Sequence, residues 1–192
     1  MPEQTVPCVL YESPGAQNTP RTLQIAKERA KQLGVKHVLV ASTSGATGAL
    51  AAEAFQGQPV VVVAHSMGFA ATNKQELLPE HAERIRELGG QIVVATHALG
   101  GVGRAIRRKL STYQSEEIVA FTLRSLGQGL KVACEITVMA VDAGLVPSGA
   151  EVIAIAGTGK GADTAAVILS ANAQDFFDLR VLEVLCKPRI PR

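Results

Sequence analysis

The amino-acid sequence predicts an α/β fold in three layers, with helices covering both faces of a mostly parallel sheet. Two observations support this prediction. Solidly apolar runs rich in Val and Ile recur along the chain, and segments with the three-to-four spacing of an amphipathic helix separate them. A strand that is apolar on both sides must be covered on both faces, which is typical of parallel sheets.

The first half of the chain alternates strands and helices. Residues 6–12 are predicted to form the first strand, and a helix is predicted to follow from Pro20, with Thr19 as its N-cap and Gly34 as its end. The apolar face of this helix repeats at helical spacing: Leu23, Ala26, Ala30 and Leu33. Further strands are predicted at residues 37–41, 60–64 and 92–96, with helices at 49–55 and 79–88.

The second half begins with a helical stretch. Helices are predicted at residues 104–110, 116–126 and 130–143, the first two at the surface and the third more deeply buried. Strands are predicted again at residues 151–156 and 181–186. No linker, charge block or low-complexity segment divides the sequence, so we expect one domain spanning residues 1–192.

Composition narrows the classes of partner. The 192 residues include 19 Lys and Arg against 17 Asp and Glu, for a net charge of +2, and only 4% are aromatic. Nucleic-acid binding needs a basic field and stacking surfaces, so no nucleic-acid partner is expected. No apolar run approaches the roughly 20 residues of a membrane helix, and the N-terminus lacks a signal-peptide pattern. We therefore expect a cytoplasmic protein with no membrane partner.

Cysteine content and hydrophobicity give two further expectations. Cys8, Cys134 and Cys186 are widely separated and form no C-x-x-C pair, so we expect reduced cysteines in the core. Because 47% of the residues are hydrophobic, we expect exposed apolar surface and a homo-oligomer.

Four of the predicted strands end in polar, glycine-rich segments, at residues 42–48, 65–68, 97–101 and 157–164. In open parallel sheets, ligands bind beyond the carboxyl ends of the strands, where helix N-termini and main-chain amides converge. Any one of these segments can be an ordinary turn, because Gly and Ser are common turn residues. Their number predicts a ligand site at this edge of the sheet.

The segment at residues 42–47, called the 42–47 loop below, has the composition of a phosphate site. It supplies hydroxyl groups and main-chain amides just before a predicted helix, through Ser42, Thr43, Ser44, Gly45 and Thr47. A Walker A loop is excluded, because the pair Gly159-Lys160 is followed by Gly161 instead of Ser or Thr.

Other strand ends contribute further candidate ligand contacts. His65 and His97 each begin an H-x-x-G sequence at matching strand ends, so they are expected to approach a common pocket with Gly68. Taken singly, either histidine fits a hydrogen-bonded structural role better than a ligand contact. The segment after residue 156 matches a weak form of the dinucleotide fingerprint G-x-G-x-x-A, and its candidate contacts are Gly157, Gly161, Ala162, Asp163 and Thr164.

Two groups of charged residues leave alternatives open. Glu135 and Asp142 are seven residues apart on one predicted helix and therefore share a face, which either meets solvent or a basic partner or presents a carboxylate to the ligand. The basic cluster Arg104, Arg107, Arg108 and Lys109 is interpreted as a solvated face, with an anion or subunit contact as the alternative.

Several kinds of chemistry have no support in the sequence. No H-E-x-x-H or comparable spacing indicates a metal site, and no G-x-S-x-G elbow indicates a hydrolase. No residue is assigned a catalytic role.

The stretch HVLVASTSGATGALAAEAFQGQPVVVVAH resembles the C-terminal α/β domain of pyruvate kinases. In that domain the loop matching Ser42, Thr43, Ser44, Gly45 and Thr47 holds a sugar-phosphate effector. A catalytic barrel of roughly 250 residues has no room in this sequence, so the pyruvate kinase reaction is not expected.

The sequence also resembles small stand-alone proteins built on this domain, through YESPGAQNT, ASTSGATG, GLKVACEITVMAVDAG, GKGADTA and FFD…LCKPR. This resemblance implies bound flavin mononucleotide (FMN), with its phosphate on the 42–47 loop and Glu135 near the ribityl chain or ring. A flavin-dependent redox role would follow. The alternative is a non-catalytic module that binds or senses a phosphorylated metabolite through the same loop.

Overall fold

A computed structural model describes residues 3–189. Its single sheet has seven strands in the order β1-β7-β6-β5-β2-β3-β4. The strands are β1 (Val9–Tyr11), β2 (His37–Ala41), β3 (Val60–His65), β4 (Gln91–Ala95), β5 (Glu151–Ala156), β6 (Thr164–Leu169) and β7 (Arg180–Pro188). Only β6 runs antiparallel to its neighbours β5 and β7. The predicted α/β fold with a mostly parallel sheet is therefore confirmed.

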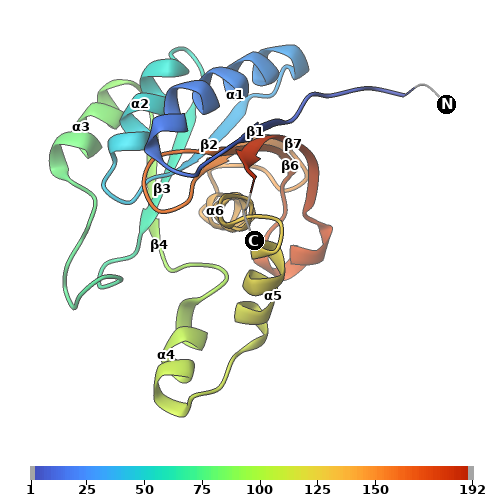
Figure 1. The fold of residues 1–192 in the computed structure, drawn as a ribbon. Coiled ribbons are helices and arrows are strands. Elements are labelled where there is room, and N and C mark those ends of the chain that lie inside the picture. The colour runs from blue at the N-terminus through green and yellow to red at the C-terminus, as the bar shows by residue number, and fades with distance from the viewer. Residues whose placement is uncertain (1–2, 190–192) are drawn as a thin grey trace.

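Helices cover both faces of this sheet, as Figure 1 shows. Helices α1 (Thr19–Leu33), α2 (Ala46–Ala54) and α3 (Pro79–Glu87) lie on one face. Helix α6 (Gln128–Asp142) lies on the other. Helices α4 (Gly101–Leu110) and α5 (Ser115–Arg124) form an arm that extends from the body beyond β4. Short 3₁₀ helices occupy Ala16–Asn18 and Ala173–Asp178.

The three layers explain why the interior of a central strand such as β2 is apolar on both faces. In β2, Val38 and Val40 pack in the core beneath α1 and α2, whereas Leu39 packs in the core beneath α6. All three side chains are 0% exposed. Successive side chains of a strand point to opposite faces, so a strand covered on both sides needs apolar residues at every position.

The start of α1 differs from the prediction by one residue. Asn18 occupies the N-cap position, and Thr19 is the first helical residue. The Thr19 hydroxyl instead accepts a hydrogen bond from the main-chain N–H of Ala162, at 2.9 Å. Gly34 ends the helix with a left-handed φ of 67°, as its position in the sequence predicts.

Strand β6 is absent from the prediction. Its sequence, TAAVIL, pairs along its whole length with β5, from Glu151↔Leu169 to Ala156↔Thr164, so residues 157–163 form the loop of a hairpin. No helix follows these glycines, and the dinucleotide fingerprint at Gly157 and Ala162 is therefore wrong, because that motif requires a helix start.

Element boundaries shift modestly elsewhere. Strand β1 is shorter than the predicted residues 6–12, and β7 extends beyond the predicted residues 181–186. Helix α2 begins at Ala46, three residues earlier than predicted, which places Thr47 in its first turn. Helix α4 begins at Gly101 instead of Arg104.

The cysteines follow the prediction in two of three cases. Cys134 and Cys186 are buried and free, but Cys8 is exposed, so its predicted core position is wrong. Cys8 precedes the short edge strand β1, where no element covers it. Within residues 3–189, no helix combines the length and apolarity needed to cross a membrane.

Candidate functional site

The carboxyl ends of β2, β3 and β4 lie side by side, because these strands are consecutive in the parallel part of the sheet. The 42–47 loop follows β2, His65 ends β3, and His97 follows β4 by two residues. Helices α2 and α4 begin at this edge. The fourth predicted segment, which begins at residue 157, follows β5, the parallel neighbour of β2 on its other side, so all four segments begin at this edge of the sheet.

The 42–47 loop is a tight turn that leads into α2. The Ser42 hydroxyl accepts a hydrogen bond from Gly48 N–H at 3.2 Å, and the main-chain N–H of Ser42 donates to the Val63 carbonyl at 3.0 Å. Gly45 caps the helix with a φ of 93°, a conformation that a residue with a Cβ rarely adopts. The loop is therefore fixed at both ends by its own sequence.

The amides at the start of α2 are unsatisfied within the described residues. The N-cap residue Gly45 has no side chain to accept a hydrogen bond, and the Ser42 and Ser44 hydroxyls accept only from Gly48 and Ala46. The N–H groups without an acceptor there are those of Thr43, Ser44, Gly45 and Thr47. The side chains of Thr43, Ser44 and Thr47 are half-buried. Unpaired amides with the positive end of a helix dipole form a cradle suited to an anion.

One side of this loop is covered by the segment between β3 and α3. The Ser44 carbonyl accepts a hydrogen bond from Leu78 N–H at 3.0 Å. A Cβ added at Gly45 would lie 2.6 Å from His81 Cβ and 2.8 Å from Leu77 Cδ1. Glycine is thus required at residue 45 by close packing as well as by its backbone conformation.

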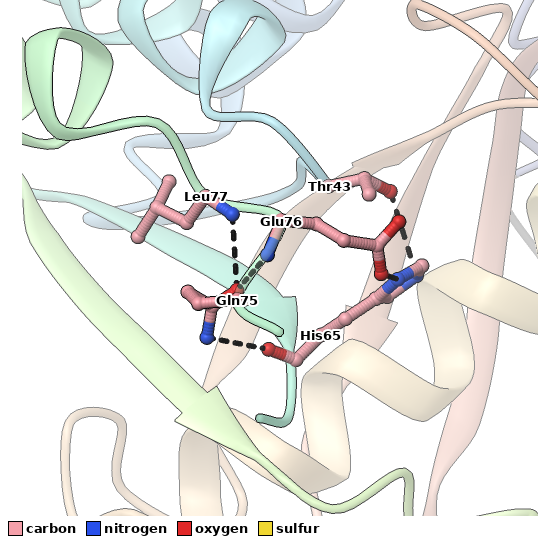
Figure 2. Close-up of polar contacts among 5 residues, drawn as sticks. All are labelled: Thr43, His65, Gln75, Glu76 and Leu77. Carbon is pink, nitrogen blue, oxygen red and sulfur yellow. Dashed lines mark hydrogen bonds and ion pairs between the residues drawn. The ribbon is translucent and has the colours of Figure 1, made fainter. Parts of the chain in front are cut away.

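His65 links the loop to a carboxylate, as Figure 2 shows. Its Nδ1 lies 2.8 Å from Glu76 Oε2, and its Nε2 lies 3.4 Å from Thr43 Oγ1. Gln75 holds this arrangement, because its amide group donates to the His65 carbonyl and accepts from the N–H groups of Glu76 and Leu77. With Glu76 accepting from Nδ1, the other ring nitrogen is available to a hydroxyl or a ligand on the loop side.

His97 lies beside His65, so the structure brings the two predicted histidines together. Their ring centroids are 5.0 Å apart, and the Phe69 ring packs against both, at 4.0 Å from His65 and 4.5 Å from His97. Burial lowers the pKa of His97 to about 4, and the neighbouring Glu135 carboxylate opposes this shift. His97 is therefore neutral at pH 7.

A cavity of about 400 Å³ opens next to these rings. It lies between the ends of β3 and β4 and the first turns of α4. Its polar and aromatic lining consists of Ser66, Phe69, Thr96, His97, Arg104, Arg108 and Lys109, and the rest is Gly68, Gly100, Gly101 and Ala105. Of the predicted site residues, Gly68 and His97 line it. The 42–47 loop does not line the cavity, and His65 lies between the loop and the cavity.

Glu135 does not face this cavity. It is 2% exposed, and its two carboxylate oxygens accept hydrogen bonds from Leu99 N–H at 3.0 Å and Lys131 Nζ at 2.5 Å. Asp142 is exposed and instead accepts from Asn172 and Ala173. Glu135 and Asp142 therefore do not form a shared surface for a ligand. Glu135 instead pairs with a basic side chain, Lys131, as the alternative interpretation expected. Its carboxylate fixes the segment just before α4.

The 157–163 hairpin loop is tied to the N-terminal segment of the chain. The Asp163 carboxylate, 0% exposed, accepts from Gly15 N–H, Thr158 N–H and the Thr164 hydroxyl. Thr164 is covered by the start of α6, because a Cβ at Gly129 would lie 2.1 Å from its hydroxyl oxygen. Ala162 is also buried, and Gly161 packs on Ala16. The polar groups of Asp163 and Thr164 are thus used within the protein. The hairpin loop begins at Gly157, which follows β5 beside the end of β2.

Sequence reasoning missed the Glu76 carboxylate, and it noted the basic residues of α4 without assigning them to the site. Glu76 belongs to an irregular segment without periodicity, so nothing in the sequence connects it to His65. Arg104 and Arg108 do carry a signal, since they are four residues apart on a helix that follows a glycine-rich strand end. That spacing places them on one face of α4, the face toward the cavity.

Comparison with known proteins identifies the fold family. A family model described as pyruvate kinase, alpha/beta domain, matches residues 21–168. Two crystal structures of pyruvate kinase from Cryptosporidium parvum are similar to this chain. One is 16% identical, with a TM-score of 0.39, over 78% of this chain and 23% of that one. The other is 17% identical, with a TM-score of 0.33, over 70% of this chain and 20% of that one.

The chain thus spans less than a quarter of the length of those two enzymes. The family match, by contrast, covers most of this sequence, from α1 into β6. The protein belongs to the pyruvate kinase alpha/beta domain family.

Proposed function

We propose that this protein binds a phosphorylated small molecule at the carboxyl edge of the sheet, with the phosphate on the 42–47 loop, and that the ligand is FMN. The observation that carries the proposal is the cradle at the start of α2. Four main-chain amides there have no acceptor within the described residues, and the side chains around them are hydroxyls. A phosphate dianion accepts several such hydrogen bonds at once.

The neighbouring geometry supports a ligand larger than phosphate alone. The His65 ring contacts the loop through Thr43, and the packed rings of Phe69 and His97 lead from it to the cavity of about 400 Å³. This volume is within the roughly 300–1,000 Å³ range of small-molecule sites. In the proposal, the loop holds the phosphate of FMN and the aromatic side chains contact its ring. The flavin would supply the redox chemistry, and the protein would bind and orient it.

The Glu76–His65 pair is suited to handling a proton at this position. Glu76 orients the His65 ring, and Nε2 faces the loop through Thr43. A histidine held in this way can donate a hydrogen bond from Nε2 to a bound phosphate when that nitrogen carries the proton. We assign His65 to the ligand site on this geometry and give it no catalytic role.

A second candidate is a phosphometabolite-binding module without redox chemistry. The side chains that line the cavity favour it, because six of them end in hydroxyl, imidazole or basic groups that can hydrogen-bond to a sugar phosphate. A sugar phosphate would satisfy both the loop and such a wall.

Titration of the full-length protein separates these candidates. FMN and fructose 1,6-bisphosphate are titrated into wild type, Ser44→Ala, Thr47→Val and the control Ser148→Ala by calorimetry. Ser148 is exposed and lies in the loop before β5, at the opposite edge of the sheet. The proposal predicts FMN affinity that falls about tenfold or more in each loop variant, because hydrogen bonds to charged groups contribute about 1.5–3 kcal/mol each. Binding of the sugar bisphosphate without FMN would favour the module instead, and equal FMN affinity in all four proteins would reject the phosphate assignment.

A further inference from the structure

The four basic side chains of α4 are not equivalent. Arg107 faces α5, where its guanidinium lies 2.8 Å from the buried carboxylate of Glu117. Within residues 3–189, the side chains of Arg104, Arg108 and Lys109 have no acidic partner, and all three line the cavity. None of the described residues that line the cavity is acidic. The cavity thus carries uncompensated positive charge, in contrast to the other face of the same helix.

Arg104 is held in place by an aromatic ring. Its guanidinium carbon lies 4.5 Å from the centroid of Phe69, whose other neighbours are His97 and His65. Stacking on a ring uses the face of a guanidinium and leaves its N–H groups, which point outward in the plane, free to donate. The Arg104 side chain makes no hydrogen bond within the described residues. It is an oriented donor without an acceptor.

Two glycines make room in front of Arg104. A Cβ at Gly100 would lie 3.2 Å from an Arg104 guanidinium nitrogen, and a Cβ at Gly101 would lie 3.0 Å from a Thr96 methyl carbon. Both glycines line the cavity at the N-terminus of α4, with the hydroxyls of Ser66 and Thr96 nearby. Side chains at either glycine would narrow the space beside the guanidinium. The absence of side chains at Gly100 and Gly101 therefore keeps the cavity open beside the Arg104 guanidinium.

His97 adds a neutral hydrogen-bonding group to the lining of the cavity. It lines the cavity and is neutral at pH 7, so its ring serves as a hydrogen-bonding group. The mixture of guanidinium, ammonium, hydroxyl and neutral imidazole groups matches the oxygens of a phosphate or carboxylate.

We propose that the α4 side of this cavity, formed by Arg104, Arg108, Lys109, Gly100 and Gly101, is a second oxyanion site, distinct from the 42–47 loop. It takes the phosphate or carboxylate group of a small organic anion. If the loop holds FMN, this anion is the substrate presented to the flavin. This last step rests on the proposed function, whereas the oxyanion site itself does not.

Nuclear magnetic resonance of the ¹⁵N-labelled full-length protein tests the proposal. Sodium phosphate is titrated first, and sodium oxalate serves as the carboxylate probe. The amide signals of Gly100 and Gly101 are expected to shift with a midpoint separate from that of Ser44 and Gly45. In Arg104→Gln/Arg108→Gln, the affinity read at Gly100 and Gly101 should fall about tenfold or more, while the affinity read at Ser44 and Gly45 stays unchanged.

Control variants make the outcome decisive. Arg86→Gln removes an exposed arginine of α3 that lines no part of the cavity, and it should leave both sets of shifts unchanged. Arg108→Gln alone changes only an exposed side chain. The ¹⁵N spectrum of each variant, the double variant included, shows directly whether its fold is intact. Phosphate shifts confined to the loop, or shifts at Gly100 that persist in the double variant, would overturn the second site. Failure of FMN to bind while the Gly100 shifts remain would reject the proposed function and leave this site standing.

Discussion

Replacing Gly45 with alanine tests how the 42–47 loop is packed. Gly45 has a φ of 93°, and its Cβ would meet His81 Cβ at 2.6 Å and Leu77 Cδ1 at 2.8 Å. The left-handed conformation costs an alanine about 1–2 kcal/mol, and overpacking costs about 1–3 kcal/mol more. Gly45→Ala should therefore lower the free energy of unfolding by about 2–5 kcal/mol.

Gly34 provides a matched control for the backbone cost. Its φ is 67°, and a Cβ there would meet nothing within 4 Å. Gly34→Ala should cost only the conformational part, about 1–2 kcal/mol. Urea unfolding followed by circular dichroism measures both variants, and their difference isolates the contact with Leu77 and His81. Equal destabilisation of the two variants would refute the conclusion that the segment before α3 covers the loop.

Three further outcomes follow from the buried polar groups. Glu135→Gln leaves Lys131 charged and unpaired in the core, so it should lower the free energy of unfolding by about 3–5 kcal/mol, whereas Lys131→Met/Glu135→Leu should recover most of that loss; equal values in urea unfolding would contradict this. The pKa of His97 is lowered from its ordinary 6.5 to about 4, so between these pH values the folded state binds fewer protons than the unfolded state. Stability therefore falls as the pH is lowered. When thermal unfolding is compared at pH 7.5 and pH 4.5, wild type should lose more stability than His97→Gln, and equal losses would contradict this. Asp163→Asn weakens the hydrogen bonds that the carboxylate accepts from Gly15, Thr158 and Thr164, and it should lower the free energy of unfolding by about 1–3 kcal/mol, measured by urea unfolding. An unchanged free energy of unfolding would show that these bonds do not stabilise the fold.

The parallel part of the sheet could be predicted because its information is local. Apolar residues run without interruption through residues 38–41 of β2, 60–64 of β3 and 152–156 of β5, and glycine or hydroxyl residues follow each strand at the sheet edge. The helix of residues 19–33 likewise carries its own start and stop signals, Pro20 and Gly34. These features depend on side-chain type and spacing alone.

The hairpin could not be predicted because its cause is distant in the chain. The glycine-rich residues after β5 fit a helix start as well as a turn. The bond from Gly15 to Asp163 joins residues 148 positions apart, and the bond from Thr19 to Ala162 has the same effect. Contacts between residues so far apart in the chain leave no signal in the local sequence pattern.

In the candidate site, too, the local features could be predicted from the sequence and the contacts between distant residues could not. The 42–47 loop was recognisable because its glycine, its hydroxyls and the helix start are contiguous. The pairing of His65 with Glu76 depends on an irregular segment. The basic residues of α4 were visible, but only the structure divides them between Arg107, which pairs with Glu117, and the residues that line the cavity.

The relative affinity for FMN and riboflavin is the measurement that tests the central claim most directly. The two molecules share the ring and the ribityl chain and differ in the phosphate, so their affinity ratio isolates the contribution of the 42–47 loop. Titration of ligand-free protein, followed by flavin fluorescence, should give FMN binding at least about a hundredfold tighter than riboflavin, since two charged hydrogen bonds contribute about 3 kcal/mol or more. Equal affinity for both, or no binding of either, would contradict a phosphate-dependent flavin site.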